Sequence, residues 1–179
     1  MDTWIAPDTL FDGSDLRTGV ALRLDGSIVA EVAPAPSTAV PLSGTVTPGF
    51  IDLQVNGGGG VMVNSTPTAD GMRKVAAAHG TLGTVAILPT VITDDALVLD
   101  AVTDAAIAAK GDKGILGLHI EGPHISLIRR GTHASEFIRP MDTRTLDNVR
   151  RLRAAGVAVM ITVAPEATTP AQISELCDL

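Results

Sequence analysis

The sequence predicts an α/β fold with a parallel sheet, preceded by a short all-β segment. After residue 46, strand-like segments alternate with helix-like segments, whereas the first 46 residues contain strand-like segments only. Hydrophobic residues make up 45% of the chain and charged residues 18%, a balance that fits strands buried inside a sheet. With 179 residues, the chain is long enough to bury a sizeable core.

Residues 1–46 are predicted to form the N-terminal part of a small β-sandwich domain. Two β-rich runs within residues 18–32 flank Asp25-Gly26, a dipeptide that is typical of tight hairpin turns. The prolines at positions 34, 36 and 41 mark the connection that follows.

Residues 47–179 are predicted to contain four strand–helix units. The expected strands cover residues 46–56, 84–88, 115–121 and 157–163. The expected helices begin at Ser65 or Thr66, near residue 93, near residue 142 and at Thr169, each after a capping residue. Strands that alternate with helices in this way indicate a parallel sheet.

The alternation of side chains within each strand favours a barrel over an open sheet. In the first strand, Ile51, Leu53 and Val55 share one face, and Gln54 and Asn56 share the other. An open doubly wound sheet would need apolar residues on both faces, whereas in a (β/α)8 barrel the aliphatic face meets the outer helices. The polar face then surrounds the barrel axis at the carboxyl ends of the strands.

A complete eight-stranded barrel needs about 250 residues. Residues 47–179 hold only four of the eight units, and the last helix is still running at Leu179. We therefore expect a truncated barrel, the first half of a longer protein.

Composition excludes several classes of function. The net charge of −7 argues against binding to nucleic acid or to an anionic membrane surface. No apolar run reaches the roughly 18 residues of a membrane span. A single cysteine, Cys177, excludes an internal disulfide and a cysteine-rich zinc site. Since residues 1–4 do not resemble the start of a secretory signal, we expect a cytoplasmic protein.

Glu121 is the first candidate for chemistry, because it lies at the predicted carboxyl end of the third strand. A carboxylate in this position either ligates a metal ion or simply leaves the strand into solvent. His119 lies deeper on the same face and is more typical of a hydrogen-bonded core residue. His133, on the long loop after this strand, either lines the site or is solvated. His124 could be an exposed loop residue and is left unassigned.

Gln54 and Asn56 occupy positions where barrel hydrolases often carry a His-x-His pair. Amide side chains are poorer zinc ligands than imidazole, so the pair disfavours a two-metal site of that kind. The pair could instead hold a metal-bound water or a substrate hydroxyl. Glu166, after the fourth strand, either supports the site or caps the strand, and Arg129-Arg130 either attract an anionic substrate or are solvated.

Five segments of the chain resemble the N-acetylglucosamine-6-phosphate deacetylase family of the amidohydrolase superfamily. They are Pro48-Gly-Phe-Ile-Asp-Leu-Gln-Val-Asn-Gly57, Leu88-Pro-Thr-Val-Ile-Thr93, Gly117-Leu-His-Ile-Glu-Gly-Pro123, Arg130-Gly-Thr-His133 and Thr162-Val-Ala-Pro-Glu166. They follow the family's order and spacing over residues 46–166. The His-x-Glu-Gly-Pro motif followed by Gly-Thr-His is the most specific part, and His124 departs from the family pattern.

The resemblance implies metal-dependent removal of acetate from N-acetylglucosamine 6-phosphate, giving glucosamine 6-phosphate. Glu121 would be a metal ligand with Gln54 near the metal, and Thr132 and His133 would contact the amino sugar, with Asn56 a further candidate. The divalent ion would be zinc, with iron, manganese and cobalt as alternatives. The family's two metal-binding histidines and its acid/base aspartate would lie beyond residue 179, so we expect the chain alone to be inactive.

Two other interpretations remain open. The chain could be a non-catalytic half-barrel that associates with itself or with a partner, and its exposed strand edges would otherwise favour aggregation. It could also be another amide hydrolase of the superfamily, such as a dihydroorotase-like enzyme, although Gln54-x-Asn56 in place of His-x-His argues against that. For the leading interpretation we expect an amino-sugar phosphate as the small-molecule partner and a homo-oligomeric full-length protein.

Overall fold

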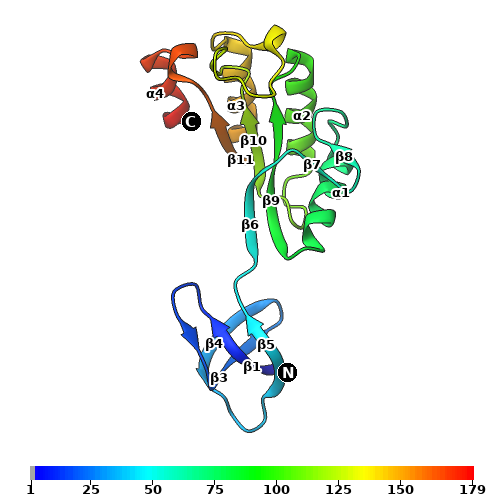
Figure 1. The fold of residues 1–179 in the computed structure, drawn as a ribbon, viewed down its shortest axis with the longest axis vertical. Coiled ribbons are helices and arrows are strands. Elements are labelled where there is room, and N and C mark those ends of the chain that lie inside the picture. The colour runs from blue at the N-terminus through cyan, green and yellow to red at the C-terminus, as the bar shows by residue number, and fades with distance from the viewer. Residues whose placement is uncertain (1–2) are drawn as a thin grey trace. The chain divides into compact units, whose positions relative to one another are not determined.

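The computed structural model describes residues 3–179, in two compact units (Figure 1). The first unit ends at Gly49, and the second covers Phe50–Leu179. The first two residues of the predicted β segment lie outside the described residues. None of the helices within residues 3–179 is long and apolar enough to cross a membrane.

The first unit is a five-stranded β-sheet. Its strands are β1 (Thr3–Phe11), β2 (Leu16–Arg17), β3 (Val20–Asp25), β4 (Ile28–Pro34) and β5 (Val40–Val46). The sheet runs β2-β1-β3-β4 with antiparallel pairs, and β5 pairs with β1 in parallel. The hairpin predicted around Asp25-Gly26 is confirmed, because β3 and β4 pair across a turn in which Gly26 has a φ of 59°.

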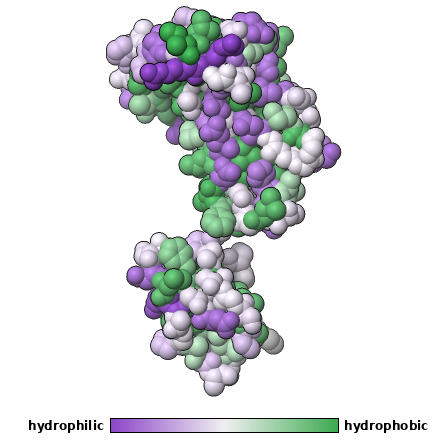
Figure 2. All heavy atoms as spheres, viewed as in Figure 1, coloured by the Kyte–Doolittle hydropathy of each residue, from purple (hydrophilic) through white to green (hydrophobic). Residues whose placement is uncertain are grey.

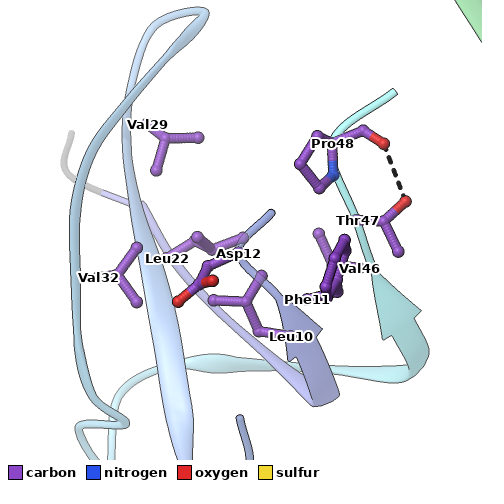
Figure 3. Close-up of a pocket in the computed structure, with 9 residues that line it drawn as sticks. All are labelled: Leu10, Phe11, Asp12, Leu22, Val29, Val32, Val46, Thr47 and Pro48. Atoms are coloured by element: carbon purple, nitrogen blue, oxygen red, sulfur yellow. Dashed lines mark hydrogen bonds between the residues drawn. The ribbon is translucent and has the colours of Figure 1, made fainter. Parts of the chain in front are cut away.

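The first unit has a small hydrophobic core. Leu10, Val20 and Leu22 are buried, and Val32 and Val46 pack against them. Beside this core lies an open cavity of about 290 Å³, and Figure 3 shows the largely aliphatic side chains of β1, β3, β4 and β5 around it. A sheet of this size therefore leaves part of its apolar face uncovered by the described residues.

The second unit is an α/β layer structure built on a parallel sheet. Its strands are β6 (Phe50–Val55), β7 (Gly57–Gly58), β8 (Val61–Met62), β9 (Thr84–Ile92), β10 (Gly117–Glu121) and β11 (Ala158–Thr162). Its helices are α1 (Ala69–Gly80), α2 (Ala96–Ala108), α3 (Thr143–Ala154) and α4 (Pro170–Asp178), with short 3-10 turns at Ser135–Phe137 and Pro165–Ala167. The main sheet has the order β11-β10-β9-β6, and β7 and β8 form a separate small hairpin.

Helices α1, α2 and α3 pack against this sheet and bury the main hydrophobic core (Figure 1). Met72 from α1, Val102 from α2 and Leu152 from α3 are almost completely buried there, as are Ile87 and Leu118 from the strands. Side chains capping the helix N-termini, among them Asp95, Asp142 and Thr169, accept hydrogen bonds from backbone N–H groups of the first turns. The four predicted strand–helix units are therefore present.

The structure corrects three details of the predicted elements. The expected strand 46–56 begins only at Phe50, because residue 46 ends β5 of the first unit. The first helix is capped by Thr68 rather than by Ser65 or Thr66. The second strand extends to Ile92 instead of ending at residue 88.

The aliphatic face of β6 is also less buried than the alternation predicts. Val55 is buried, but Ile51 and Leu53 are 57% and 50% exposed. The physical reason is that β6 is an edge strand of the described sheet, and no helix within residues 3–179 covers this part of its face. Figure 2 shows hydrophobic residues reaching the surface of this unit.

Thr103 provides a test of core packing. Its hydroxyl is fully buried in α2 and has no hydrogen-bond partner among residues 3–179. We expect Thr103→Val to raise the free energy of unfolding by about 1 kcal/mol, because it removes an unsatisfied buried polar group at nearly constant volume. Urea unfolding followed by circular dichroism measures the change.

Thr145→Val is the matched control. Thr145 is equally buried, but its hydroxyl bonds the ring of His124, so the same substitution should lower the free energy of unfolding by about 1 kcal/mol or more. Equal effects of the two substitutions would contradict this account of the core.

Candidate functional site

The candidate site lies at the carboxyl edge of the parallel sheet. Glu121 is the last residue of β10, where it pairs with Ile92 of β9 and with Thr162 of β11. In α/β folds, side chains at this edge converge because neighbouring parallel strands end together. The Glu121 side chain is only 20% exposed, which excludes the alternative that it leaves the strand into solvent.

Gln54 lies on β6, which is not adjacent to the strand of Glu121, β10, and yet the two side chains meet. The Gln54 amide Nε2 donates a hydrogen bond of 2.8 Å to Glu121 Oε2, although β9 lies between β6 and β10. The backbones of β6 and β10 are two inter-strand spacings apart, about 10 Å. The long side chains of Gln54 and Glu121 span this distance and meet over β9, on the same face of the sheet. There Thr90, which is small and buried, accepts the backbone N–H of Val55 at 2.9 Å. The hydrogen bond from Gln54 thus holds the Oε2 atom of Glu121 in place.

His133 approaches the other oxygen of the same carboxylate. It comes from the long loop between β10 and α3, and its Nε2 lies 3.7 Å from Glu121 Oε1. Its Nδ1 lies 2.8 Å from the hydroxyl of Thr93, the residue that directly follows β9. The His133 side chain is 13% exposed, so a freely solvated loop histidine is excluded.

His119 supports the site from below. It is buried, with Nε2 2.8 Å from the Thr162 hydroxyl and Nδ1 3.4 Å from the Thr90 hydroxyl. Burial lowers the pKa of His119, and the nearby Glu121 carboxylate opposes this effect. The ring is therefore neutral at pH 7 and links three strands through its hydrogen bonds, which matches the expectation of a core residue.

His124 was left unassigned, with an exposed loop position as one reading, and the structure excludes that reading. Its side chain is completely buried, with Nδ1 3.0 Å from the carbonyl oxygen of Arg139 and Nε2 2.8 Å from the Thr145 hydroxyl. The Nδ1–H donates to the carbonyl, and Nε2 accepts from the hydroxyl. His124 therefore fastens the start of the long loop to its end and to the first turn of α3. A hydropathy pattern cannot reveal this, because both partners lie more than ten residues away.

The remaining candidates lie around, rather than in, the cluster formed by the residues described above: Gln54, Thr93, His119, Glu121 and His133. Thr132 is exposed beside His133 on the loop. Asn56 follows β6, and its side-chain nitrogen is buried without a hydrogen-bond partner among residues 3–179. Glu166 is exposed, and a hydrogen bond from Ser126 is the main influence that lowers its carboxyl pKa. Arg130 donates a hydrogen bond to the carbonyl oxygen of His133 at 3.3 Å.

Thr93 is the residue of this cluster that the sequence reasoning did not single out. Its position immediately after a strand, at the same sheet edge as Glu121, was the available signal.

The donor set suits a divalent cation only in part. Glu121 offers a carboxylate with one oxygen engaged by Gln54, and His133 offers an imidazole beside it. Within residues 3–179 there is no group of three or more histidine, cysteine, aspartate or glutamate side chains arranged to hold a metal ion. Tight binding of zinc requires three or four protein ligands, so these residues fit as part of a site.

The sequence of the chain is similar to those of known amino-sugar phosphate deacetylases. No model of a protein family matches it. It is 42% identical to the N-acetylgalactosamine-6-phosphate deacetylase of Shewanella sp. (strain ANA-3), over 90% of this chain and 41% of the relative. It is 32% identical to the N-acetylglucosamine-6-phosphate deacetylase of Haemophilus influenzae, over 74% of this chain and 37% of the relative.

Solved structures agree with the sequence comparison. The N-acetylglucosamine-6-phosphate deacetylase of Pasteurella multocida matches with a TM-score of 0.88 and 27% identity, over 99% of this chain and 48% of that chain. The Mycobacterium smegmatis enzyme in complex with N-acetyl-D-glucosamine 6-phosphate matches with a TM-score of 0.85 and 27% identity, over 99% and 47%.

By sequence and by fold, the chain is similar to part of known N-acetylglucosamine-6-phosphate deacetylases. It spans less than half the length of the relatives it matches. The resemblance to deacetylases that the sequence motifs indicated is thus confirmed, because the proteins that match this chain are named as such deacetylases.

The buried His124 gives a prediction on pH. Burial lowers the pKa of His124 below the ordinary 6.5, so the folded protein holds the ring neutral while the unfolded chain takes up a proton. The unfolded state therefore binds more protons below pH 6.5, and the free energy of unfolding should fall as the pH is lowered through that value.

Two measurements check this expectation. In a ¹⁵N–¹H correlation titration of the histidine side chains, the His124 ring should protonate only below pH 6.5. Urea unfolding at pH 7.5 and at pH 5.5 should show lower stability at the acidic value. Protonation of His124 at or above pH 6.5 would contradict the structural account of its burial.

Proposed function

We propose that the chain is part of a metal-dependent deacetylase that acts on an N-acetylated hexosamine 6-phosphate. The reaction adds water to the acetamide bond and gives acetate and the free amino-sugar phosphate, with N-acetylglucosamine 6-phosphate as the substrate that the sequence predicts. One observation carries the proposal: Glu121, Gln54 and His133 meet at the carboxyl edge of a parallel sheet. The names of the relatives support the same reaction.

The proposal includes the architecture. Residues 47–179 would supply the first four units of a (β/α)8 barrel, and residues 1–46 would supply part of a small β-sandwich. Two features support it: β6 and β11 each pair on one side only within the described sheet, and Ile51 and Leu53 remain exposed on β6. Further strands and helices would cover both edges.

Each residue has a distinct proposed role. Glu121 ligates the metal through its carboxylate, and Gln54 orients that carboxylate by donating to its second oxygen. His133, Thr132 and Asn56 contact the sugar from the loop and from the end of β6. The bound metal would polarise the acetamide carbonyl and lower the pKa of water. An aspartate outside residues 3–179 would act as general base and then as general acid.

The chemistry of the donors guides the choice of metal. The Glu121 carboxylate, combined with the two metal-binding histidines that the family resemblance implies outside residues 3–179, suits zinc, and iron, manganese and cobalt accept the same donors. We propose zinc as the first choice on this basis.

The substrate could instead be the C4 epimer, N-acetylgalactosamine 6-phosphate. The observation that favours it is the higher identity, 42% against 32%, to the relative named for that sugar. A direct comparison of both sugar phosphates in one assay decides between them.

A chimera tests the function. This chain would replace the matching segment of the Shewanella sp. relative, and acetate release would be measured with both sugar phosphates. We expect turnover, and a loss of about 100-fold or more for Glu121→Gln, because the loss of a metal ligand costs at least as much as the loss of its supporting contacts.

Glu31→Gln is the control for the chimera. Glu31 is a half-exposed carboxylate on β4 that pairs with Arg23, and its substitution should leave turnover unchanged. Full activity of the Glu121→Gln chimera would refute the role of Glu121.

The isolated 179-residue chain should not release acetate from either sugar phosphate. The reason is that residues 3–179 contain no complete cluster of metal ligands. Detectable turnover by the purified chain, abolished by Glu121→Gln, would show that the described residues suffice and would contradict this expectation.

A further inference from the structure

The Asn64 side chain holds the two residues that flank Thr93, Ile92 through its backbone and Asp94 through its carboxylate. Asn64 Oδ1 accepts the N–H of Ile92 at 3.0 Å, and Asn64 Nδ2 donates to the Ile92 carbonyl at 3.0 Å and to Asp94 Oδ2 at 2.9 Å. Asn64 thus brackets Thr93 from the segment that follows the β7–β8 hairpin. The position of Thr93 is fixed independently of the loop that carries His133.

The Thr93 side chain is also enclosed. Thr93 is only 4% exposed, and a Cβ atom on Gly122 would lie 2.2 Å from its hydroxyl oxygen. Gly122 has a φ of 82°, a conformation that glycine adopts without strain. The backbone at Gly122 therefore lies against the Thr93 hydroxyl, which is 2.8 Å from Nδ1 of His133.

The direction of the Thr93–His133 hydrogen bond follows from two independent arguments. Within residues 3–179, the Thr93 hydroxyl has His133 Nδ1 as its hydrogen-bond partner, and a buried hydroxyl uses its proton to donate. If Thr93 donates, Nδ1 is the acceptor and the ring proton lies on Nε2. The second argument is electrostatic: Nε2 faces the Glu121 carboxylate at 3.7 Å, which attracts an N–H and repels a lone pair.

We propose that Thr93 is a positioning residue that holds His133 in the Nε2–H tautomer and directs this proton into the site beside Glu121. The gap of 3.7 Å exceeds a hydrogen bond, so Glu121 does not consume the donor. Building on the proposed deacetylase function, the Nε2–H is the donor for an acceptor oxygen of the amino sugar bound next to the metal. Asn64 fixes the position of Thr93 through its two neighbours in the chain, and the Gly122 backbone packs against the Thr93 hydroxyl.

The test uses nuclear magnetic resonance of the 179-residue chain with ¹⁵N-labelled histidine. The chain has four histidines, so each ring can be assigned by single substitutions. The spectrum is recorded at a pH above the protonation steps found by titrating the same sample, where the two nitrogen frequencies of each neutral ring report the position of its proton. For His133 we expect a protonated Nε2 and an unprotonated Nδ1.

Three variants separate positioning from packing. Thr93→Val keeps the shape but removes the donor, so the frequency difference between the two His133 nitrogens should shrink as both tautomers become populated. Thr93→Ser keeps a hydroxyl and should restore the difference. Thr103→Val removes a buried hydroxyl that bonds no described residue, and it should leave the His133 spectrum unchanged.

Several results would overturn the proposal. A proton on Nδ1 of His133 in the unsubstituted chain contradicts it directly, even if Thr93→Val fails to fold. An unchanged His133 spectrum in a folded Thr93→Val variant does the same. Since the experiment needs neither metal nor substrate, its outcome is separate from that of the deacetylation assay.

Discussion

The carboxylate of Glu121 is held by a hydrogen bond to one of its oxygens and lies beside the His133 ring at the other, and the rest of the site is arranged around it. Gln54 donates to one oxygen from β6, and the ring of His133 faces the other from the loop after β10. Neither contact could form unless parallel strands brought their carboxyl ends to one edge. The helices that pack on the sheet stabilise that edge, because Ile87 of β9 and Leu118 of β10 are buried in the core that they form.

The long loop is a second consequence of the same arrangement. It leaves β10 at Glu121 and must return to α3, and His124 ties its two ends together through the Arg139 carbonyl and the Thr145 hydroxyl. Near its middle, His133 is secured by Thr93. A loop fastened at its ends and at one internal point can hold a side chain at a defined place without forming a helix or strand.

Local patterns in the sequence were sufficient for much of the fold and for the centre of the site. Alternating residues placed Gln54 and Glu121 on the same face of their strands, and the capping residue Asp142 marked the start of α3 correctly. The exposure of Leu53 and the burial of His124 were not predictable, because each depends on what lies opposite in space rather than along the chain. The same limit applies to Thr93, whose partner is forty residues away.

The metal content of the chimera with the Shewanella sp. relative tests most directly whether Glu121 is a ligand. Elemental analysis of the purified chimera should find bound divalent metal, and most of it should be absent from the Glu121→Gln form while a Glu31→Gln form retains it. The same metal content in the folded Glu121→Gln and unsubstituted proteins would contradict the account, since the convergence of side chains on Glu121 would then serve only the fold.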